Sequence, residues 1–314
     1  MPKVLITTSS FNVDAAEPLA LLRQAGYEIA INPHGRKLSE DEVAGLLAED
    51  VVGMVAGTEP LTRRVLSGAK GLKVVSRCGI GLDSVDLAAA AELGIEVTNT
   101  PDAPSAAVAE LTLGLMLDQL RRISQADRQI RAGQWKPLMG GLLAARTVGI
   151  VGYGRIGRRV ARLARAFGAR VLAADAAGVA ADDVAEASAL EPLLAQADIV
   201  TLHMPSQKGA GHFLDAQRIG MMKRGAVLVN TARGDLVDEA VLVQAIRDGH
   251  LGGAALDTYE KEPYTGPLAE LPQVVLTAHM GSYAEESRGI MEREAADNLY
   301  KGLAARGLVA GRAA

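Results

Sequence analysis

Short apolar runs alternate with amphipathic segments along the N-terminal third of the chain. The runs have the length of β-strands and comprise Val4 to Thr7, Tyr27 to Ile31, Val51 to Ala56, Val74 to Arg77 and Ile95 to Thr98. Helix-like segments separate them. One begins at Ser39-Glu40-Asp41-Glu42, which has capping-box spacing, and another, Asp86 to Leu93, can end at Gly94 in the left-handed conformation. This alternation predicts a mostly parallel sheet with helices on both faces.

The pattern changes in the middle of the chain and then resumes. From Ser105 to Ala132 the apolar positions predict one long helix, and a loop rich in Gly, Pro and Met follows around Pro137 to Gly141. A last helix is expected from Glu285 to Leu303. The strands of the second series are expected at Thr147 to Val151, Arg170 to Ala174, Ile199 to Leu202, Ala226 to Asn230, Gly253 to Leu256 and Val274 to Thr277. The chain is therefore predicted to form two α/β domains, with a first boundary where Pro101 interrupts regular structure.

Composition limits the classes of protein that this chain can represent. Of its 314 residues 49% are hydrophobic but only 3% are aromatic, so we expect cores of Ala, Val, Leu and Ile. The net charge of -4 leaves no basic excess for a nucleic-acid backbone or an anionic membrane. The run Val4 to Thr7 is too short for a signal-peptide core, and no apolar run is long enough to span a bilayer. Cys78 is the one cysteine, so no internal disulfide can form, which is compatible with a reducing cytosol and with the cytoplasmic location that we expect.

A glycine-rich turn is the strongest single motif in the chain. Gly152, Gly154 and Gly157 give the pattern G-x-G-x-x-G directly after an apolar strand and directly before an amphipathic helix, Arg158 to Phe167. The first glycine permits the tight turn, the second lets the backbone approach a pyrophosphate, and the third lets the helix pack closely on the strand. The N-terminus of the helix then offers amide N–H groups to the phosphates. The motif in this context predicts a dinucleotide site.

A carboxylate downstream of the turn indicates which dinucleotide is bound. Asp175 ends the next predicted strand, where a carboxylate accepts hydrogen bonds from the adenosine ribose and repels a 2′-phosphate. No Lys or Arg occurs between Val171 and Gln207 to neutralise such a phosphate. The predicted cofactor is therefore NAD rather than NADP.

Three further segments place polar residues just past the ends of predicted strands. They are Val229 to Gly234, Ala255 to Pro263 and Leu276 to Ser282. Open α/β sheets bind their ligands outside the carboxyl ends of the strands, so these segments are candidates for the catalytic groups.

With these segments the sequence resembles the D-isomer-specific 2-hydroxyacid dehydrogenase family, and within it most closely the phosphoglycerate dehydrogenase branch. The matching pieces are the glycine turn, the three strand-end segments, and Arg77-Cys78-Gly79-Ile80-Gly81-Leu82-Asp83, Asn99-Thr100-Pro101 and Val108-Ala109-Glu110. The resemblance implies two Rossmann-like, doubly wound parallel-sheet domains with the active site in the cleft between them. It also implies a substrate-binding domain of residues 1–99 and 284–314, which the C-terminal helix completes, and an NAD-binding domain of residues 100–283.

The resemblance assigns the catalytic Arg, Glu and His of the family to Arg233, Glu262 and His279. Reduction of a 2-keto acid delivers a hydride to C2 and a proton to the carbonyl oxygen. His279 can exchange that proton, because histidine ordinarily titrates near pH 6.5. Glu262 can hold the other ring nitrogen, and Arg233 can bind the substrate carboxylate with its planar guanidinium and polarise the keto oxygen.

The resemblance also supplies the remaining binding residues. The turn around Arg77, Gly79, Ile80 and Gly81 is expected to bind the substrate, partly through backbone N–H groups. The expected cofactor contacts are Gly152, Gly154, Arg155, Ile156, Gly157, Asp175, His203, Pro205, Thr231, Ala232, Asp257 and Gly281, with Asp257 near the nicotinamide carboxamide. The family implies a homodimer, to which the helix near Ser105 to Ala132 contributes. No spacing of His, Cys or carboxylates suggests a metal site.

The chain departs from the phosphoglycerate dehydrogenase branch at the end of its third strand. That branch usually carries an arginine there for the substrate phosphate, whereas this chain has Ala56. Glu59 nearby would repel a phosphate, although Arg77 is retained and Lys136 is a possible second cation. A phosphorylated substrate such as 3-phosphoglycerate and an unphosphorylated or sulfonate-type hydroxy acid therefore both stay open.

Two other functions compete with this interpretation. Formate dehydrogenases share the architecture but need no proton acceptor and replace the glutamate by glutamine, so Glu262 argues against them. Family members that bind NAD and act as transcriptional corepressors can keep the same three catalytic residues. A binding module without turnover is thus the alternative to a dehydrogenase, and turnover of NADH with a 2-keto acid distinguishes the two.

Overall fold

The computed structural model describes residues 1–179, 182–206 and 209–310. The chain divides into two compact units, one of Met1–Pro104 with Ser282–Ala314 and the other of Ser105–Gly281. We call these unit 1 and unit 2 and describe each by itself. Residues 311–314, at the end of the predicted substrate-binding domain, lie outside the described residues.

Unit 1 is built on a five-stranded sheet in which all strands are parallel. The strands lie in the order β2-β1-β3-β4-β5. The chain therefore moves from β1 to β2 in one direction and then crosses back to β3 on the other side of β1. The strands are β1 (Lys3–Ile6), β2 (Glu28–Ile31), β3 (Val51–Ala56), β4 (Val74–Arg77) and β5 (Glu96–Asn99).

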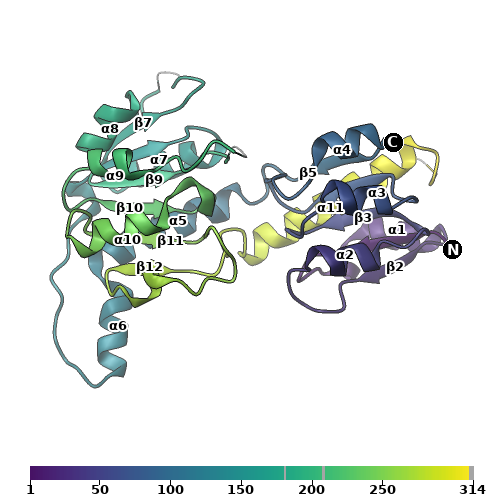
Figure 1. Cartoon of the computed structure of the whole chain (residues 1–314), viewed down its shortest axis with the longest axis horizontal. Coiled ribbons are helices and arrows are strands. Elements are labelled where there is room, and N and C mark those ends of the chain that lie inside the picture. Colours follow the sequence, from purple (N-terminus) through teal and green to yellow (C-terminus); the bar gives the residue numbers. More distant parts are fainter. Residues whose placement is uncertain (180–181, 207–208, 311–314) are drawn as a thin grey trace. The chain divides into compact units, whose positions relative to one another are not determined.

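Helices cover both faces of this sheet because successive strand residues point to opposite sides. Val4 and Ile6 face a core shared with α1 and α11, whereas Leu5 faces a core shared with α2, α3 and α4. The long C-terminal helix α11, yellow in Figure 1, lies so close to the sheet that a Cβ on Gly302 would stand 2.8 Å from Cγ1 of Val74. The helices are α1 (Glu17–Gln24), α2 (Glu40–Leu46), α3 (Arg63–Gly68), α4 (Leu87–Glu92) and α11 (Glu285–Ala305), with a 3-10 turn η1 (Val13–Ala15).

Unit 2 is built on a seven-stranded parallel sheet. Its strand order is β12-β11-β10-β9-β6-β7-β8, so the order reverses between β6 and β9. The strands are β6 (Thr147–Val151), β7 (Arg170–Ala174), β8 (Glu186–Ala187), β9 (Ile199–Leu202), β10 (Val227–Asn230), β11 (Gly253–Leu256) and β12 (Val274–Leu276). The two parallel sheets confirm the predicted fold class of two Rossmann-like α/β domains.

Two cores lie on the two faces of this sheet. Val148 and Ile150 pack with α5 and α7, whereas Val151 and Leu202 pack with α8 and α10. The helices are α5 (Ser105–Arg121), α6 (Ile123–Arg131), α7 (Arg155–Ala166), α8 (Leu190–Gln196), α9 (Ala216–Met221) and α10 (Glu239–Arg247). Short 3-10 turns are η2 (Leu143–Ala145), η3 (Gly234–Leu236) and η4 (Pro267–Glu270).

The prediction of one helix from Ser105 to Ala132 is wrong, because the chain breaks at Arg122. That residue has a φ of 56°, in the left-handed region. The carboxylate of Asp118 accepts hydrogen bonds from the Ser124 amide, at 2.7 Å, and from the Ser124 hydroxyl. These bonds satisfy donors at the start of α6, which is why a new helix can begin there. The apolar periodicity continues across the break and so did not reveal it.

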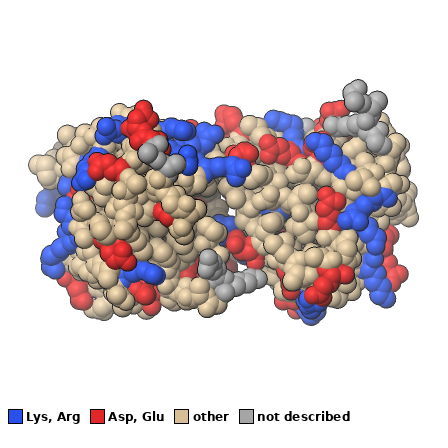
Figure 2. All heavy atoms as spheres, turned by 90° about the horizontal axis from the view of Figure 1, so that it is seen from above, with Lys and Arg blue, Asp and Glu red and all other residues tan. Residues whose placement is uncertain are grey.

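Two further features concern the charges on the surface and the apolar character of the helices. Figure 2 shows Lys, Arg, Asp and Glu side chains intermixed on the face of each unit that it displays. In the described part of the chain, no helix is long and apolar enough to cross a membrane.

Candidate active site

The glycine turn connects β6 to α7, and the three glycines have different surroundings. Gly152 has a φ of 93°, and a Cβ there would stand 2.6 Å from the carbonyl atoms of His203. A Cβ on Gly157 would overlap the carbonyl oxygen of Gly152. By contrast, no atom lies within 4 Å of the Cβ position of Gly154. Protein packing thus requires the first and third glycines, while the second leaves open space in which a ligand can approach the backbone.

The start of α7 fits an anionic group such as a pyrophosphate. Its N-cap is Gly154, which has no side chain to bond the first N–H groups, and the helix runs for 12 residues. Arg155, exposed, and Ile156, half-buried, occupy the first turn. The amide groups and the positive end of the helix dipole are available to phosphate oxygens.

Asp175, the predicted ribose-binding carboxylate, lies against the same turn. It follows β7, and its Oδ2 accepts a hydrogen bond of 2.6 Å from the Tyr153 amide, while Oδ1 accepts one of 2.9 Å from the Ala177 amide. The carboxylate is therefore fixed beside the glycine turn. Together with the open space at Gly154, this arrangement fits a dinucleotide.

Tyr153, inside the glycine turn, is held by the segment before β8. Its hydroxyl donates to Oδ2 of Asp182 at 2.8 Å, and the guanidinium of Arg158 lies 5.2 Å from its ring centroid. Burial, together with the Asp182 hydrogen bond, raises the pKa of Tyr153 to about 12. Asp182 in turn accepts from the amides of Val184 and Ala185, both at 2.9 Å. This network ties Tyr153 of the glycine turn to the segment before β8.

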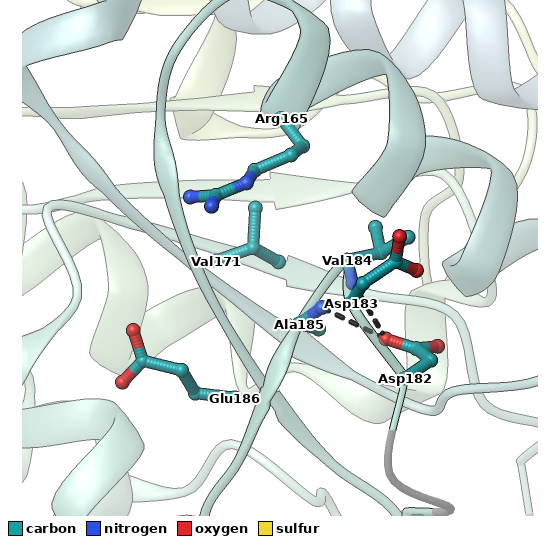
Figure 3. Close-up of a pocket in the computed structure, with 7 residues that line it drawn as sticks. All are labelled: Arg165, Val171, Asp182, Asp183, Val184, Ala185 and Glu186. Carbon is teal, nitrogen blue, oxygen red and sulfur yellow. Dashed lines mark hydrogen bonds between the residues drawn. The ribbon is translucent and has the colours of Figure 1, made fainter.

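A small pocket borders the same segment, as Figure 3 shows. Its volume is about 100 Å³, and its apolar lining residues are Val171, Val184 and Ala185. It lies near Arg165 at the C-terminal end of α7, whereas the glycine turn is at the N-terminal end. Its lining contains none of the predicted dinucleotide-binding residues, although Asp182 also accepts a hydrogen bond from Tyr153 of the glycine turn. Its lining comprises Arg165, Val171, Asp182, Asp183, Val184, Ala185 and Glu186.

His203 and Pro205 follow β9, on the other side of β6. The His203 amide donates to the carbonyl of Val151 at 2.7 Å, and its Nε2 lies 2.9 Å from the Thr201 hydroxyl. Burial lowers the pKa of His203 to about 3, so the ring is neutral at physiological pH. Pro205 is exposed. His203 thus places an uncharged ring at the end of β9, and its backbone packs against Gly152 of the glycine turn.

The turn after β10 carries Arg233 and is held by an asparagine. Asn230 accepts from the Ala232 amide at 3.0 Å and donates to the Arg233 carbonyl at 2.7 Å. Arg233 donates through Nη1 to the Ala232 carbonyl at 2.6 Å. The Thr231 hydroxyl lies 2.9 Å from that of Thr112 on α5. The sequence predicted residues 231–233 as site residues but not the hydrogen bonds of Asn230 and Thr112 that hold them. Asn230 looked like the ordinary end of a strand, and Thr112 is distant in sequence.

The loops after β11 and β12 bring Glu262 and His279 together. Nδ1 of His279 lies 2.9 Å from Oε1 and 3.1 Å from Oε2 of Glu262. The His279 side chain is 40% exposed and that of Glu262 26%, so the pair is reachable by a ligand. Because Nδ1 faces the carboxylate, Nε2 is the ring nitrogen that can exchange a proton with a substrate.

Asp257 shapes the loop that carries His279. It is 1% exposed. Its Oδ1 accepts from the Thr277 hydroxyl at 2.6 Å and from the Met280 amide at 2.8 Å, and its Oδ2 accepts from the Gly281 amide at 2.8 Å. These three bonds bracket His279, whose φ of 49° lies in the left-handed region. Sequence reasoning predicted a cofactor contact for Asp257 and missed this supporting role.

In unit 2 the fold gathers most of the predicted residues at one edge. The strands β12, β11, β10, β9 and β6 are consecutive neighbours, and their carboxyl ends carry the predicted groups. These are Gly152, Gly154, His203, Pro205, Thr231, Ala232, Arg233, Asp257, Glu262, His279 and Gly281. The edge therefore combines a dinucleotide-type turn with a histidine–carboxylate pair and an arginine.

The predicted substrate residues of unit 1 lie after β4. Arg77 is 8% exposed, and its Nη1 donates to the Cys78 carbonyl. The Gly79 amide donates to the Thr100 hydroxyl at 2.8 Å, and Asn99 donates to the Ile80 carbonyl at 2.7 Å. Since the Gly79 N–H is already used, the predicted backbone donors of this turn reduce to those of Ile80 and Gly81.

The Cys78 thiol and the side chains that could bind a metal ion are considered next. Burial raises the pKa of the Cys78 thiol to about 11, which disfavours the nucleophilic thiolate. Among residues 1–179, 182–206 and 209–310, no group of three or more His, Cys, Asp or Glu side chains could hold a metal ion.

Comparison with known proteins identifies relatives of the chain. Residues 113–281 match the family model described as D-isomer specific 2-hydroxyacid dehydrogenase, NAD binding domain. D-3-phosphoglycerate dehydrogenase of Methanocaldococcus jannaschii is 38% identical over 92% of this chain, which spans only 55% of that relative's length. Hydroxypyruvate reductase of Thermotoga maritima is 36% identical over 85% of this chain and 89% of its own. The crystal structure of the TT0316 protein from Thermus thermophilus has 39% identity and a TM-score of 0.88, over 96% of this chain and 97% of the other.

Proposed function

The chain belongs to the D-isomer-specific 2-hydroxyacid dehydrogenase family, whose members are NAD-dependent oxidoreductases acting on CH–OH groups, and we propose that it transfers a hydride reversibly between NAD(H) and C2 of a small 2-hydroxy or 2-keto acid. The observation that carries this proposal is the His279–Glu262 pair at the same sheet edge as the glycine turn. A proton-exchanging histidine and a nicotinamide site are the two parts that such a reaction needs.

Three residues of unit 2, His279, Glu262 and Asp257, have separate roles in the proposed reaction. When bound, the nicotinamide supplies the hydride in reduction and accepts it in oxidation. His279 gives a proton from Nε2 to the keto oxygen in reduction and takes it from the hydroxyl in oxidation. Glu262 fixes the tautomer through Nδ1 and stabilises the imidazolium, while Asp257 keeps the loop of His279 in place.

Arg233 is the proposed anchor of the substrate carboxylate in unit 2. Its guanidinium can form two parallel hydrogen bonds with a carboxylate, which fixes the plane of the 2-keto acid. The Asn230 bonds hold the turn on which Arg233 stands. In unit 1 the amides of Ile80 and Gly81 are the further proposed donors to the substrate.

We propose NAD as the cofactor because of Asp175. Its carboxylate, held beside the glycine turn by Tyr153 and Ala177, can accept from ribose hydroxyls and repels a 2′-phosphate. The segment between Val171 and Gln207, of which residues 180–181 and 207 lie outside the described part, contains no Lys or Arg.

We also propose a homodimer formed through unit 2. Figure 1 shows α6 and the loop after it extending from the body of unit 2. This extension exposes large apolar side chains, with Trp135 at 90%, Met139 at 88% and Leu142 at 65%. Exposed apolar groups gathered in one segment are typical of an interface. Sedimentation should give twice the chain mass, and W135A combined with M139A should yield monomers.

The proposed activity is tested by following NADH oxidation against a panel of 2-keto acids. The panel comprises phosphohydroxypyruvate, hydroxypyruvate, glyoxylate, 2-ketoglutarate, pyruvate and a sulfonated analogue. His279→Ala should lower kcat by about 10²–10⁴-fold, which is the usual contribution of a general acid–base group. His34→Ala is the matched control, because His34 lies in unit 1 and, among the described residues, bonds within its own loop and to Glu42. No turnover across the panel, with NADH still bound, would replace this proposal by a binding module.

A further inference from the structure

The side chain of Tyr259 joins the loops that follow β11 and β12. This residue lies two positions after Asp257 and is 8% exposed. Its hydroxyl lies 2.7 Å from the Thr277 carbonyl and 2.9 Å from the Leu256 carbonyl. Leu256 ends β11, whereas Thr277 directly follows β12, and the two strands are neighbours in the sheet. The tyrosine therefore holds the loop after β11 against the start of the loop after β12.

The backbone of the same residue contacts Glu262. The Tyr259 amide donates to Oε1 of Glu262 at 3.4 Å, and this is the oxygen that lies 2.9 Å from Nδ1 of His279. A bond of this length is weak, so it guides the carboxylate but cannot fix it alone. His279 is the second residue after Thr277. Tyr259 thus reaches the carboxylate with its amide and the segment of the imidazole with its hydroxyl.

Packing keeps Tyr259 in this position. Its ring stacks on that of Tyr264, with 4.5 Å between the centroids and 25° between the planes. The Tyr264 hydroxyl accepts from the Leu268 amide at 3.1 Å, which anchors the stacking ring. A Cβ on Gly234 would overlap the carbonyl group of Tyr259. Because Gly234 follows Arg233, the turn of the proposed carboxylate anchor also packs against Tyr259.

The Tyr259 hydroxyl keeps its proton across the neutral pH range. Burial raises the pKa of Tyr259, and the neighbouring Asp257 carboxylate raises it further. The hydrogen bond between the two loops is therefore present in both directions of the proposed reaction.

We propose that Tyr259 is a positioning residue that directs the carboxylate of Glu262 onto Nδ1 of His279. With the two loops held together, the carboxylate meets Nδ1 and leaves Nε2 for the substrate. Asp257 holds the His279 loop from the end of β11, whereas Tyr259 contacts Glu262 as well. This inference rests on the proposed dehydrogenase function and adds a residue to its proton-exchanging group.

Tyr259→Phe removes the hydroxyl and keeps the ring that stacks on Tyr264. With the 2-keto acid that is turned over fastest, kcat should fall by about tenfold, because a small displacement of a catalytic group is costly. KM for NADH should stay the same, since the glycine turn is untouched. Tyr264→Phe is the matched control, because it removes a hydroxyl that bonds Leu268 instead of the His279 loop, and it should keep kcat. An unchanged kcat in Tyr259→Phe, or an equal loss in both variants, overturns the proposal.

Combination with Glu262→Gln shows whether Tyr259 acts through that carboxylate. Two residues that act through one another give effects that do not add in a double-mutant cycle. Tyr259→Phe should therefore lower kcat by about tenfold in the wild type but change it little in the Glu262→Gln background. A general loosening of the unit would lower kcat by the same factor in both backgrounds, and that result would reject the positioning role.

A measurement without substrate separates this inference from the dehydrogenase function. Nitrogen NMR spectra of the histidine rings at about pH 9, where histidine is ordinarily neutral, report which ring nitrogen carries the proton. The signals of His279 are identified by their loss in His279→Ala. The wild type should carry the proton on Nδ1, which faces Glu262, and Tyr259→Phe should show a larger share on Nε2.

The NMR and turnover results together decide between the two ideas. A tautomer shift in Tyr259→Phe, without turnover of any 2-keto acid by the wild type, would support the positioning role and reject the catalytic function. Turnover with a tautomer and a kcat that Tyr259→Phe leaves unchanged would reject the positioning role and keep the function.

Thermal unfolding checks that each variant is folded, and a further variant is available if Tyr259→Phe is not. Tyr264→Leu removes the stacking ring and keeps the Tyr259 hydroxyl. It should loosen the tyrosine and shift the His279 proton in the same direction. If Tyr259→Phe does not fold, an unchanged tautomer in Tyr264→Leu overturns the proposal.

Discussion

Both units contain a reversal of strand order, but the groups that lie at this reversal differ between them. Each is a parallel sheet whose strand order reverses once next to its first strand, between β1 and β3 in unit 1 and between β6 and β9 in unit 2. In unit 2 the reversal carries Gly154, open space and the start of α7, which present N–H groups. In unit 1 it carries Glu59 and Thr8, whose side chains are buried, and Oε1 of Glu59 accepts a hydrogen bond from the Gly57 amide.

The difference shows that sheet topology decides where a ligand can lie but not what the ligand is. The crevice follows from the reversal of strand order, whereas its charge follows from the few residues after each strand. Glycine at such a position exposes the backbone and the positive end of a helix, which suits phosphates. The buried carboxylate of Glu59 in unit 1 instead accepts hydrogen bonds from its own chain, from the Gly57 amide and the Thr7 hydroxyl. Four predictions test this contrast, beginning with the largest expected effect.

Gly154→Val should remove the anion site of unit 2 without disturbing the fold. No atom lies within 4 Å of the Cβ position, and the backbone of Gly154 is extended, so a valine fits the free protein. Its side chain would occupy the space proposed for the pyrophosphate. NADH affinity should fall on the order of 10³-fold with an unchanged Tm. Gly68→Ala, also in open space, is the control, and equal NADH binding by both variants would place the cofactor elsewhere.

Glu262→Gln tests whether the negative charge of Glu262 is needed for catalysis. The amide can still contact Nδ1 of His279 but no longer stabilises an imidazolium, so kcat should fall by about 10². NADH affinity, measured by fluorescence titration, should stay the same. A variant that keeps full kcat would show that the proton comes from another group.

Asp175→Ser should weaken the discrimination against a 2′-phosphate. The serine can still accept and donate hydrogen bonds at the ribose, but the repulsion by the carboxylate is gone. The ratio of kcat/KM for NADPH to that for NADH should rise by about tenfold. Asp182→Ser serves as the control. Asp182 bonds the side-chain hydroxyl of Tyr153, whereas Asp175 bonds the backbone amide of that residue. A ratio that moves equally in both variants would assign the effect to the loosened turn.

Acid should destabilise unit 2 through His203. Because burial lowers its folded pKa to about 3, the folded state keeps the ring neutral, whereas the unfolded chain takes up a proton below about pH 6.5. The free energy of unfolding therefore decreases as the pH falls from about 6.5 towards 3, by up to about 1.4 kcal/mol per pH unit. Hydrogen exchange at pH 7.5 and pH 5, read separately for β9 and for β1, should show faster opening of β9. His203→Gln should remove most of this pH dependence, and a dependence that persists in the variant would assign it to other groups.

Much of the fold and of the site could be predicted from local patterns. The positions of β3, β4, β6, β7, β9 and β11, the capping box at Ser39 and the left-handed Gly94 agree with the structure, since each depends on neighbours within a few residues. The glycine turn belongs to the same class. Its glycines are spaced as they are because the turn needs a left-handed backbone at Gly152 and close packing of the helix on the strand at Gly157.

Contacts between distant segments were decided only by the tertiary structure. The hydroxyls of Thr112 and Thr231 meet across 119 positions of sequence, Asp257 binds the loop of His279, and Thr100 takes up the Gly79 amide. The sequence showed Glu59 only as a charge near the end of a strand. Its burial beside Thr8 depends on β1 and β3 being neighbours, which the strand order imposes. Periodicity and turn chemistry are properties of short segments, whereas the partner of a buried polar group is chosen by packing. The sequence by itself therefore determined most of the elements and the candidate groups, and the tertiary structure determined which partners hold those groups in place.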